Sequence, residues 1–157
     1  MDTALVGVDV EKLSAYAFAV GGVLACAAGV LISSFININP TIGAFKHNAQ
    51  KIIAQAEKAR ERGCELVIFS ELAIPGYPPR DLLDKPQFIK AGQACLERLV
   101  AEIGGIGVIL GGVVDNPSPG GKPLYNEAVL FEDGRILQRV YKQLLPTYDV
   151  FDERRHF

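Results

Sequence analysis

Residues 65–83 read ELVIFSELAIPGYPPRDLL, and this stretch decides the fold class. Its apolar run 66–69 is short enough to predict a buried strand, and Glu71 follows directly behind it. The prolines and glycine of residues 75–79 predict a stiff, irregular loop. In open α/β sheets, ligands bind outside the carboxyl ends of the strands, so the sequence places Glu71 where a functional side chain is expected.

Helical and strand patterns alternate on both sides of this stretch. The apolar spacing predicts two amphipathic helices, and shorter apolar runs predict three further strands. The residues EDGR join the last two strands as a hairpin turn. The predicted order, β-α-β-α-β-β, indicates an α/β layered fold. The predicted elements are helices 48–63 and 86–105 and strands 107–114, 124–131 and 135–142, followed by a loop-like tail.

Composition excludes several classes of protein. The chain has 157 residues, of which 49% are hydrophobic and 22% charged, so it is neither disordered nor fibrous. A formal net charge of -2 gives no basic footprint for nucleic acid, and we predict no nucleic-acid partner. Residues 13–45 contain no Asp, Glu, Lys or Arg. We therefore divide the chain into an apolar head, residues 1–36, and a globular body, residues 37–157.

The head leaves two interpretations open. Residues 15–36 form an apolar stretch of 22 residues, enough for a helix to cross a hydrocarbon layer of roughly 30 Å. The alternative is a buried helix that runs into a strand. The sequence GVDVEKLSAYAFAVGGVLACAAGVL lies within residues 1–34, and these resemble a permease segment of branched-chain amino-acid ABC transporters. The head is then a membrane tether or the product of a fused reading frame.

Two charged residues of the body stand at predicted strand ends. Glu71 follows the first strand of the body, and Lys142 ends the last. A carboxylate and an ammonium at two strand ends can face one crevice, although most such residues, taken singly, are solvated surface charges.

Four motifs of the body resemble one family. They are NINPTIG at 37–43, SELAIPGYPPRDLL at 70–83, Tyr125–Asn126, and KQLLPTYDVFDERR at 142–155. Together they resemble the carbon-nitrogen hydrolase (nitrilase) superfamily. More narrowly, the body is similar to the N-terminal glutaminase domain of glutamine-dependent NAD+ synthetases, because of its GYPP-x-DLL loop and LP-x-Y-x-VFDE-x-R tail.

The resemblance implies a fold and a set of site residues. The fold is part of an α-β-β-α sandwich, and the family hydrolyses amides with a Glu-Lys-Cys triad. Matched by motif, Glu71 is the general base, Lys142 the triad lysine and Glu153 a second acid. Tyr77 and Phe151 match residues that line the glutamine pocket.

The resemblance also implies partners. The substrate is L-glutamine, and the ammonia released passes to a separate synthetase domain that uses ATP and Mg²⁺. We expect no cofactor and no metal in this chain itself. The family implies a cytoplasmic homo-oligomer, whereas the head, if it spans a membrane, would bring residues 15–36 into contact with lipid.

The family's nucleophilic cysteine lies beyond the triad lysine, and the chain reaches only 15 residues past Lys142. Cys26, Cys64 and Cys95 stand at other places in the sequence and suit small packing residues. We therefore expect an inactive fragment of a glutaminase domain. Two alternatives remain: another carbon-nitrogen hydrolase, such as a dicarboxylate ω-amidase, or a non-catalytic, membrane-tethered protein.

Overall fold

A computed structural model describes residues 39–149 and 151–157. The chain divides into two units, and all that follows concerns the second, Ile36–Phe157. The predicted membrane helix 15–36 lies outside the described residues. Within the described ranges, no helix is long and apolar enough to cross a membrane. The described elements are α2 (Phe45–Glu61), β1 (Leu66–Ile68), the 3-10 helix η1 (Arg80–Asp84), α3 (Pro86–Glu102), β2 (Gly107–Asp115), β3 (Leu124–Glu132), β4 (Arg135–Tyr141) and the 3-10 helix η2 (Glu153–Arg155).

The four strands form one mixed sheet in the order β1-β2-β3-β4. The pair β1-β2 is parallel, and the other two pairs are antiparallel. The predicted hairpin is confirmed: Asp133 and Gly134 connect β3 to β4, both with positive φ, as a two-residue turn between twisted strands requires. The described order is α-β-α-β-β-β. Three strands follow the second helix, whereas the predicted order β-α-β-α-β-β has two there, and residues 39–44 hold no strand ahead of α2.

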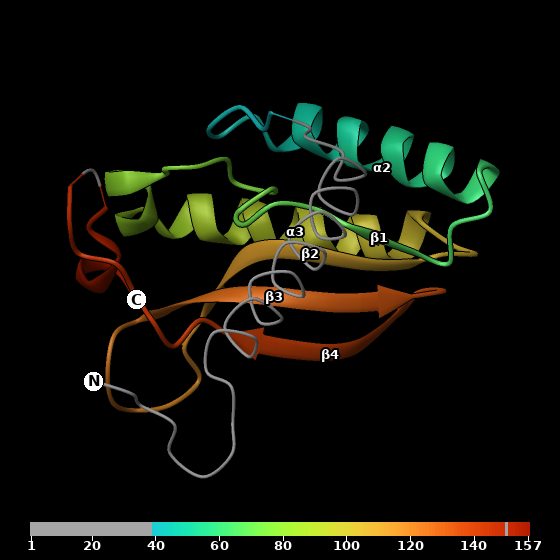
Figure 1. The fold of residues 1–157 in the computed structure, drawn as a ribbon. Helices are drawn as coiled ribbons and strands as arrows, with labels where there is room; N and C mark the ends of the chain where they lie inside the picture. Colours follow the sequence, from blue (N-terminus) through green and yellow to red (C-terminus); the bar gives the residue numbers. More distant parts are fainter. Residues whose placement is uncertain (1–38, 150) are drawn as a thin grey trace, which may run out of the picture. The chain divides into compact units, whose positions relative to one another are not determined.

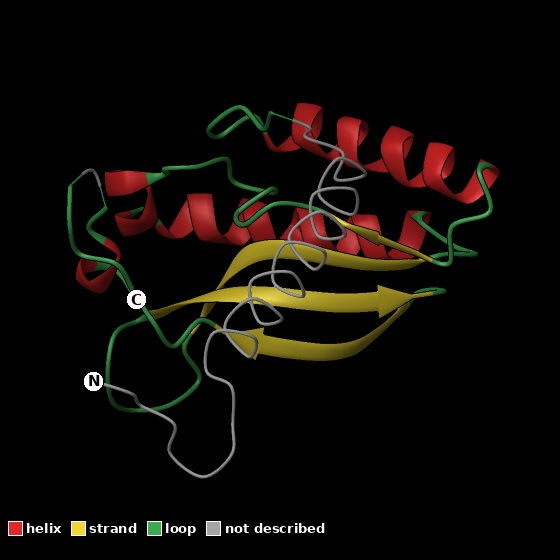
Figure 2. Cartoon of the chain, in the orientation of Figure 1, coloured by secondary structure: helices red, strands yellow, loops and turns green. Residues whose placement is uncertain are grey.

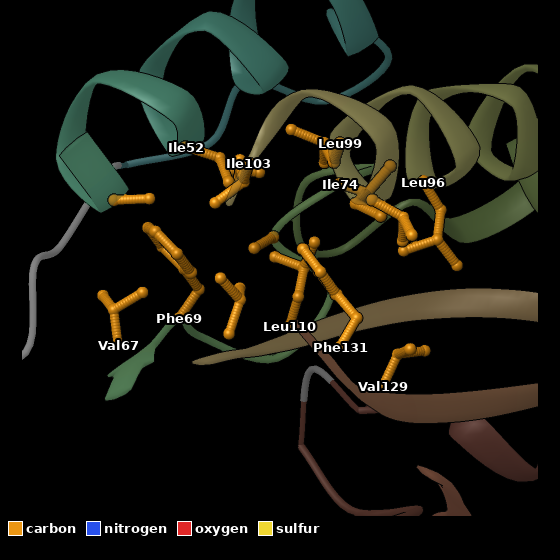
Figure 3. Close-up of a cluster of buried hydrophobic side chains, with 14 of the residues drawn as sticks. Ile52, Val67, Phe69, Ile74, Leu96, Leu99, Ile103, Leu110, Val129 and Phe131 are labelled. Carbon is orange, nitrogen blue, oxygen red and sulfur yellow. The ribbon is translucent and has the colours of Figure 1, made fainter. Parts of the chain in front are cut away.

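Helices α2 and α3 both lie on one side of the sheet (Figures 1 and 2). Their apolar faces meet the inward side chains of the strands and form the main core (Figure 3). Leu99 of α3, Leu110 of β2 and Phe131 of β3 are fully buried there. At about 25 cal/mol per Å² of apolar surface, this contact between helices and sheet is the main driving force for folding.

The other face of the sheet carries exposed apolar side chains. Leu66 and Ile68 of β1 are 46% and 37% exposed, and Val140 of β4 is 56% exposed. The side chains of a strand alternate between its two faces, so these residues point away from the core that contains Val67. The described residues thus supply one helical layer and one sheet of the predicted α-β-β-α arrangement.

Helix α2 begins three residues before the predicted start. Asn48 therefore lies inside the helix, and its side chain faces inward. Its amide donates to the carbonyl oxygens of Thr41 and Ile74, at 2.8 and 2.9 Å, and its Oδ1 accepts from the backbone N–H of Thr41 at 2.9 Å. The side chain is completely buried. Asn48 therefore ties the chain entering α2 to the loop that follows Glu71.

We expect Asn48→Ala to lower the free energy of unfolding by about 2 kcal/mol, because it removes the buried hydrogen bond to the carbonyl oxygen of Ile74 and both bonds to Thr41. Urea denaturation followed by circular dichroism measures this. The control is Asn116→Ala, since the amide of Asn116 donates to Gly120 and Lys122 in an exposed loop. An equal loss in both variants would contradict the special role of Asn48.

Candidate active site at the strand ends

Glu71 is placed by a sharp turn directly after β1. Leu72, the next residue, has a φ of 50°, a left-handed conformation that is costly for a side chain of this kind. Burial of Leu72 (1% exposed) and a hydrogen bond from the N–H of Gly76 to its carbonyl oxygen, at 2.8 Å, hold the turn in place. The turn carries Glu71 across the sheet edge, where its side chain is 44% exposed.

Gly111 of β2 makes room for that turn. A Cβ atom at this position would lie 2.5 Å from the backbone nitrogen of Leu72 and 2.9 Å from the Cα of Glu71. Both neighbours are backbone atoms, which cannot rotate aside. The approach of Glu71 to the sheet therefore depends on a glycine in the adjacent strand.

Lys142 follows β4, and its side-chain ammonium contacts the carboxylates of two acidic residues. Its Nζ donates to Oε1 of Glu71 at 2.8 Å and to Oε1 of Glu153 at 3.1 Å. The Oε2 of Glu153 also lies 2.8 Å from Nζ. The backbone N–H of Lys142 donates to the carbonyl oxygen of Asn126 at 2.9 Å, so the pairing of β4 with β3 continues up to the ammonium-bearing residue.

Glu153 enters from the C-terminal segment and is buried, at 5% exposure. Its N–H donates to the carbonyl oxygen of Pro146 at 3.1 Å, and the hydroxyl of Tyr77 donates to its Oε1 at 3.4 Å. The rings of Tyr77 and Phe151 have centroids 6.1 Å apart. The site thus has an aromatic side next to its charged centre.

The charges perturb the titration of Lys142 and Tyr77. Partial burial lowers the pKa of Lys142, but hydrogen bonds and charge from Glu153 and Glu71 outweigh it and leave the pKa above its ordinary value. Burial, followed by the negative charges of Glu153 and Glu71, raises the pKa of Tyr77. At neutral pH the lysine is therefore an ammonium and the tyrosine a neutral hydroxyl.

Two hollows border this cluster. One, of about 290 Å³, is lined by Glu71, Asn126 and Lys142 together with apolar residues of the open sheet face. The other, of about 370 Å³, is lined by Tyr77, Glu153 and the residues of η1 and the C-terminal segment. Arg155 of that segment contacts Asp81 of η1 at 3.1 Å, so an exposed ion pair connects the two walls of the second hollow. The charged cluster contributes Glu71 and Lys142 to the first hollow and Glu153 to the second.

The structure brings all five candidate residues to one place. Glu71, Lys142, Glu153 and Tyr77 are connected by hydrogen bonds, and Phe151 lies beside Tyr77. Sequence reasoning gave no role to a sixth residue. The Nδ2 of Asn126 donates to Oε1 of Glu71 at 2.6 Å. The motif Tyr125–Asn126 marked the position, but the sequence does not show which strand lies beside Glu71.

Neither described cysteine belongs to this cluster. Cys95 is buried in α3 with its Sγ 3.6 Å from the carbonyl oxygen of Phe45, and burial raises the pKa of its thiol. Cys64 is exposed behind the C-terminal end of α2. Cys26 lies outside the described residues. In ranges 39–149 and 151–157, no three potential metal-ligating side chains (His, Cys, Asp, Glu) converge.

Comparison with known proteins identifies the protein family to which this chain is similar. A model of the carbon-nitrogen hydrolase family matches residues 34–157. The glutamine-dependent NAD(+) synthetase of Synechocystis sp. is 45% identical over 124 residues, and that of Xylella fastidiosa 44% over 117. The alignments cover 76% and 74% of this chain but 22% and 21% of those proteins, so the chain spans about a fifth of the length of these relatives.

Solved structures agree. A glutamine-dependent NAD+ synthetase from Acinetobacter baumannii superposes with a TM-score of 0.69 at 38% identity, over 76% of this chain and 22% of that one. An amidase from Nesterenkonia sp. superposes with a TM-score of 0.59 over 72% of this chain and 43% of that one; at 22% identity it shows the fold alone. The predicted mixed α/β fold of this family is thereby confirmed. The comparisons give no support to a permease resemblance in residues 1–34.

We predict that Gly111→Ala disturbs the site and lowers the free energy of unfolding by about 2 kcal/mol, because the added methyl group collides with the turn that carries Glu71. The control is the next residue, Gly112→Ala, where the nearest atoms are side-chain atoms at 3.6 and 3.9 Å. Urea denaturation compares the two variants. Equal stability would show that the turn does not depend on Gly111.

A second prediction concerns pH. The pKa of Lys142 in the folded chain is raised above its ordinary 10.5, so its stabilising contribution is complete below that value and is lost as pH rises through the folded-state pKa. The stability difference between the wild type and Lys142→Met should thus be constant between about pH 7 and 9 and shrink at higher pH. A stability difference that grows as the pH rises would show that these ion pairs do not stabilise the folded chain.

Proposed function

This chain belongs to the carbon-nitrogen hydrolase family, and we propose that residues 37–157 are the N-terminal part of a glutamine-hydrolysing domain that supplies ammonia for NAD+ synthesis. The observation that carries the proposal is the ammonium of Lys142 between two carboxylates at the sheet edge, 2.8 Å from Glu71 and 2.8 Å from Glu153. The relatives at 44–45% identity are glutamine-dependent synthetases. The function of these relatives favours this branch over an ω-amidase.

Each residue has a defined task in amide hydrolysis. Glu71 accepts the proton of a thiol, and the resulting thiolate attacks the carboxamide carbon of glutamine. Lys142 stabilises the negative oxygen of the tetrahedral intermediate, an effect typically worth a few kcal/mol. The proton moves from Glu71 to the amide nitrogen, the carbon–nitrogen bond breaks, and ammonia leaves a thioester behind.

The second half of the reaction uses the same groups. Glu71 takes a proton from water, the hydroxide attacks the thioester, and the proton returns to sulfur as glutamate departs. Glu153 keeps Lys142 charged and aimed at the crevice. Tyr77 and Phe151 provide the apolar wall for the substrate's methylene groups.

The reaction needs a thiol that the described residues do not bring to the crevice. Cys64 and Cys95 lie elsewhere, and neither lines the two hollows. We propose that further polypeptide of the same enzyme supplies the nucleophile. A separate synthetase domain with ATP and Mg²⁺ would consume the ammonia. Assembly into a homo-oligomer also remains a proposal from the family alone.

A chimera tests the function. Residues 34–157 replace the matching segment of the Synechocystis enzyme, and NAD+ formation is measured with glutamine or with ammonium as nitrogen donor. We expect activity with both donors. Glu71→Gln and Lys142→Met should each lower the glutamine-dependent rate by at least about 100-fold and leave the ammonium-dependent rate unchanged, because only amide hydrolysis uses them.

Two further arms sharpen this test. Glu102→Gln is the matched control, since Glu102 pairs with Arg98 on the exposed side of α3 and should leave both rates unchanged. The polypeptide of residues 1–157 alone should release no ammonia from glutamine. Full glutamine-dependent activity in Glu71→Gln, or ammonia release by the polypeptide alone, would overturn the proposed function.

A further inference from the structure

Asn126 lies between two catalytic candidates, Glu71, which follows β1, and Lys142, which follows β4. It lies in β3, opposite Val113 of β2, and is 4% exposed. Its side chain reaches toward the β1 side of the sheet and donates to Glu71 at 2.6 Å. Its backbone oxygen faces β4 and accepts from the N–H of Lys142 at 2.9 Å. One residue therefore contacts Glu71 and Lys142 at the same time.

We propose that Asn126 is a positioning residue that holds the Glu71 carboxylate against Lys142. Both contacts of Glu71 within the described part of the chain go to the same oxygen, Oε1, from Asn126 at 2.6 Å and from Lys142 at 2.8 Å. Two donors on one oxygen restrict the rotation of the carboxylate. Oε2 then serves as the oxygen that exchanges protons with the substrate side.

The chemistry of an amide suits this task. A neutral N–H donor orients a carboxylate without adding charge, whereas an aspartate here would repel Glu71 and a leucine would offer no donor. Support from another element is needed because Glu71 follows a three-residue strand and is 44% exposed, so packing alone leaves its side chain free to turn. The turn at Leu72 sets the backbone of Glu71, and Asn126 sets its carboxylate.

A catalytic role for this contact rests on the proposed function, but the contact itself can be tested by a measurement that needs no enzyme activity. The full chain is labelled at its lysine side chains, and NMR follows the titration of the Lys142 ammonium, assigned with Lys142→Met. The proximity of Glu71 helps to raise the pKa of Lys142, so this titration reports whether the carboxylate is in place. Glu71→Gln defines the midpoint expected when that charge is absent.

In Asn126→Leu, we expect the Lys142 midpoint to fall toward lower pH by most of the drop seen in Glu71→Gln. Asn126→Ala, which removes the amide without adding bulk, should give the same result if the leucine variant folds poorly. The control is Leu99→Ala, which leaves a cavity in the main core at a fully buried side chain of α3 and should destabilise the chain without moving the Lys142 midpoint.

Two outcomes would overturn the positioning role. One is a Lys142 midpoint in Asn126→Leu and Asn126→Ala equal to that of the wild type. The other is an equal shift in Leu99→Ala, which would mean that loss of stability alone moves the Lys142 midpoint. Failure of the proposed function looks different: the chimera carrying Glu71→Gln keeps its glutamine-dependent rate, while the NMR shift in Asn126→Leu is still observed.

Discussion

The contact between one ammonium and two carboxylates, Lys142 with Glu71 and Glu153, is the interaction on which the site depends. The three residues come from the turn after β1, the end of β4 and η2, so they meet only when the sheet is complete. A charge in a partly buried position is costly unless it is paired. The ion pairs therefore fix the C-terminal segment to the sheet and also keep the side chain of Lys142 protonated.

Much of this arrangement was predictable from residue patterns. The hairpin at Asp133–Gly134, α3 and the strand before Glu71 follow from local signals such as turn residues and apolar periodicity. The grouping of Glu71 with Lys142 was predictable only through family motifs. Charge and spacing alone do not say which strands are neighbours, and here β1 and β4 are separated by two others.

The parts that could not be predicted depend on contacts between distant segments. Asn126 contacts Glu71 only because the fold places β3 between the two charged residues. Gly111 is needed only because the turn after β1 packs against β2. The start of α2 was predicted three residues too late, at Asn48. In the structure its amide is used to bind Thr41 and Ile74, which lie on either side of the helix in the chain.

The open face of the sheet has a consequence for handling the protein. Leu66, Ile68 and Val140 leave hydrocarbon in contact with solvent on this face. Salts that are excluded from protein surfaces, such as sulfate, make such contact less favourable, while low concentrations of urea relieve it. Precipitation thresholds in ammonium sulfate should consequently be low for this polypeptide, and mild chaotropes should extend its shelf life before they unfold the helical layer.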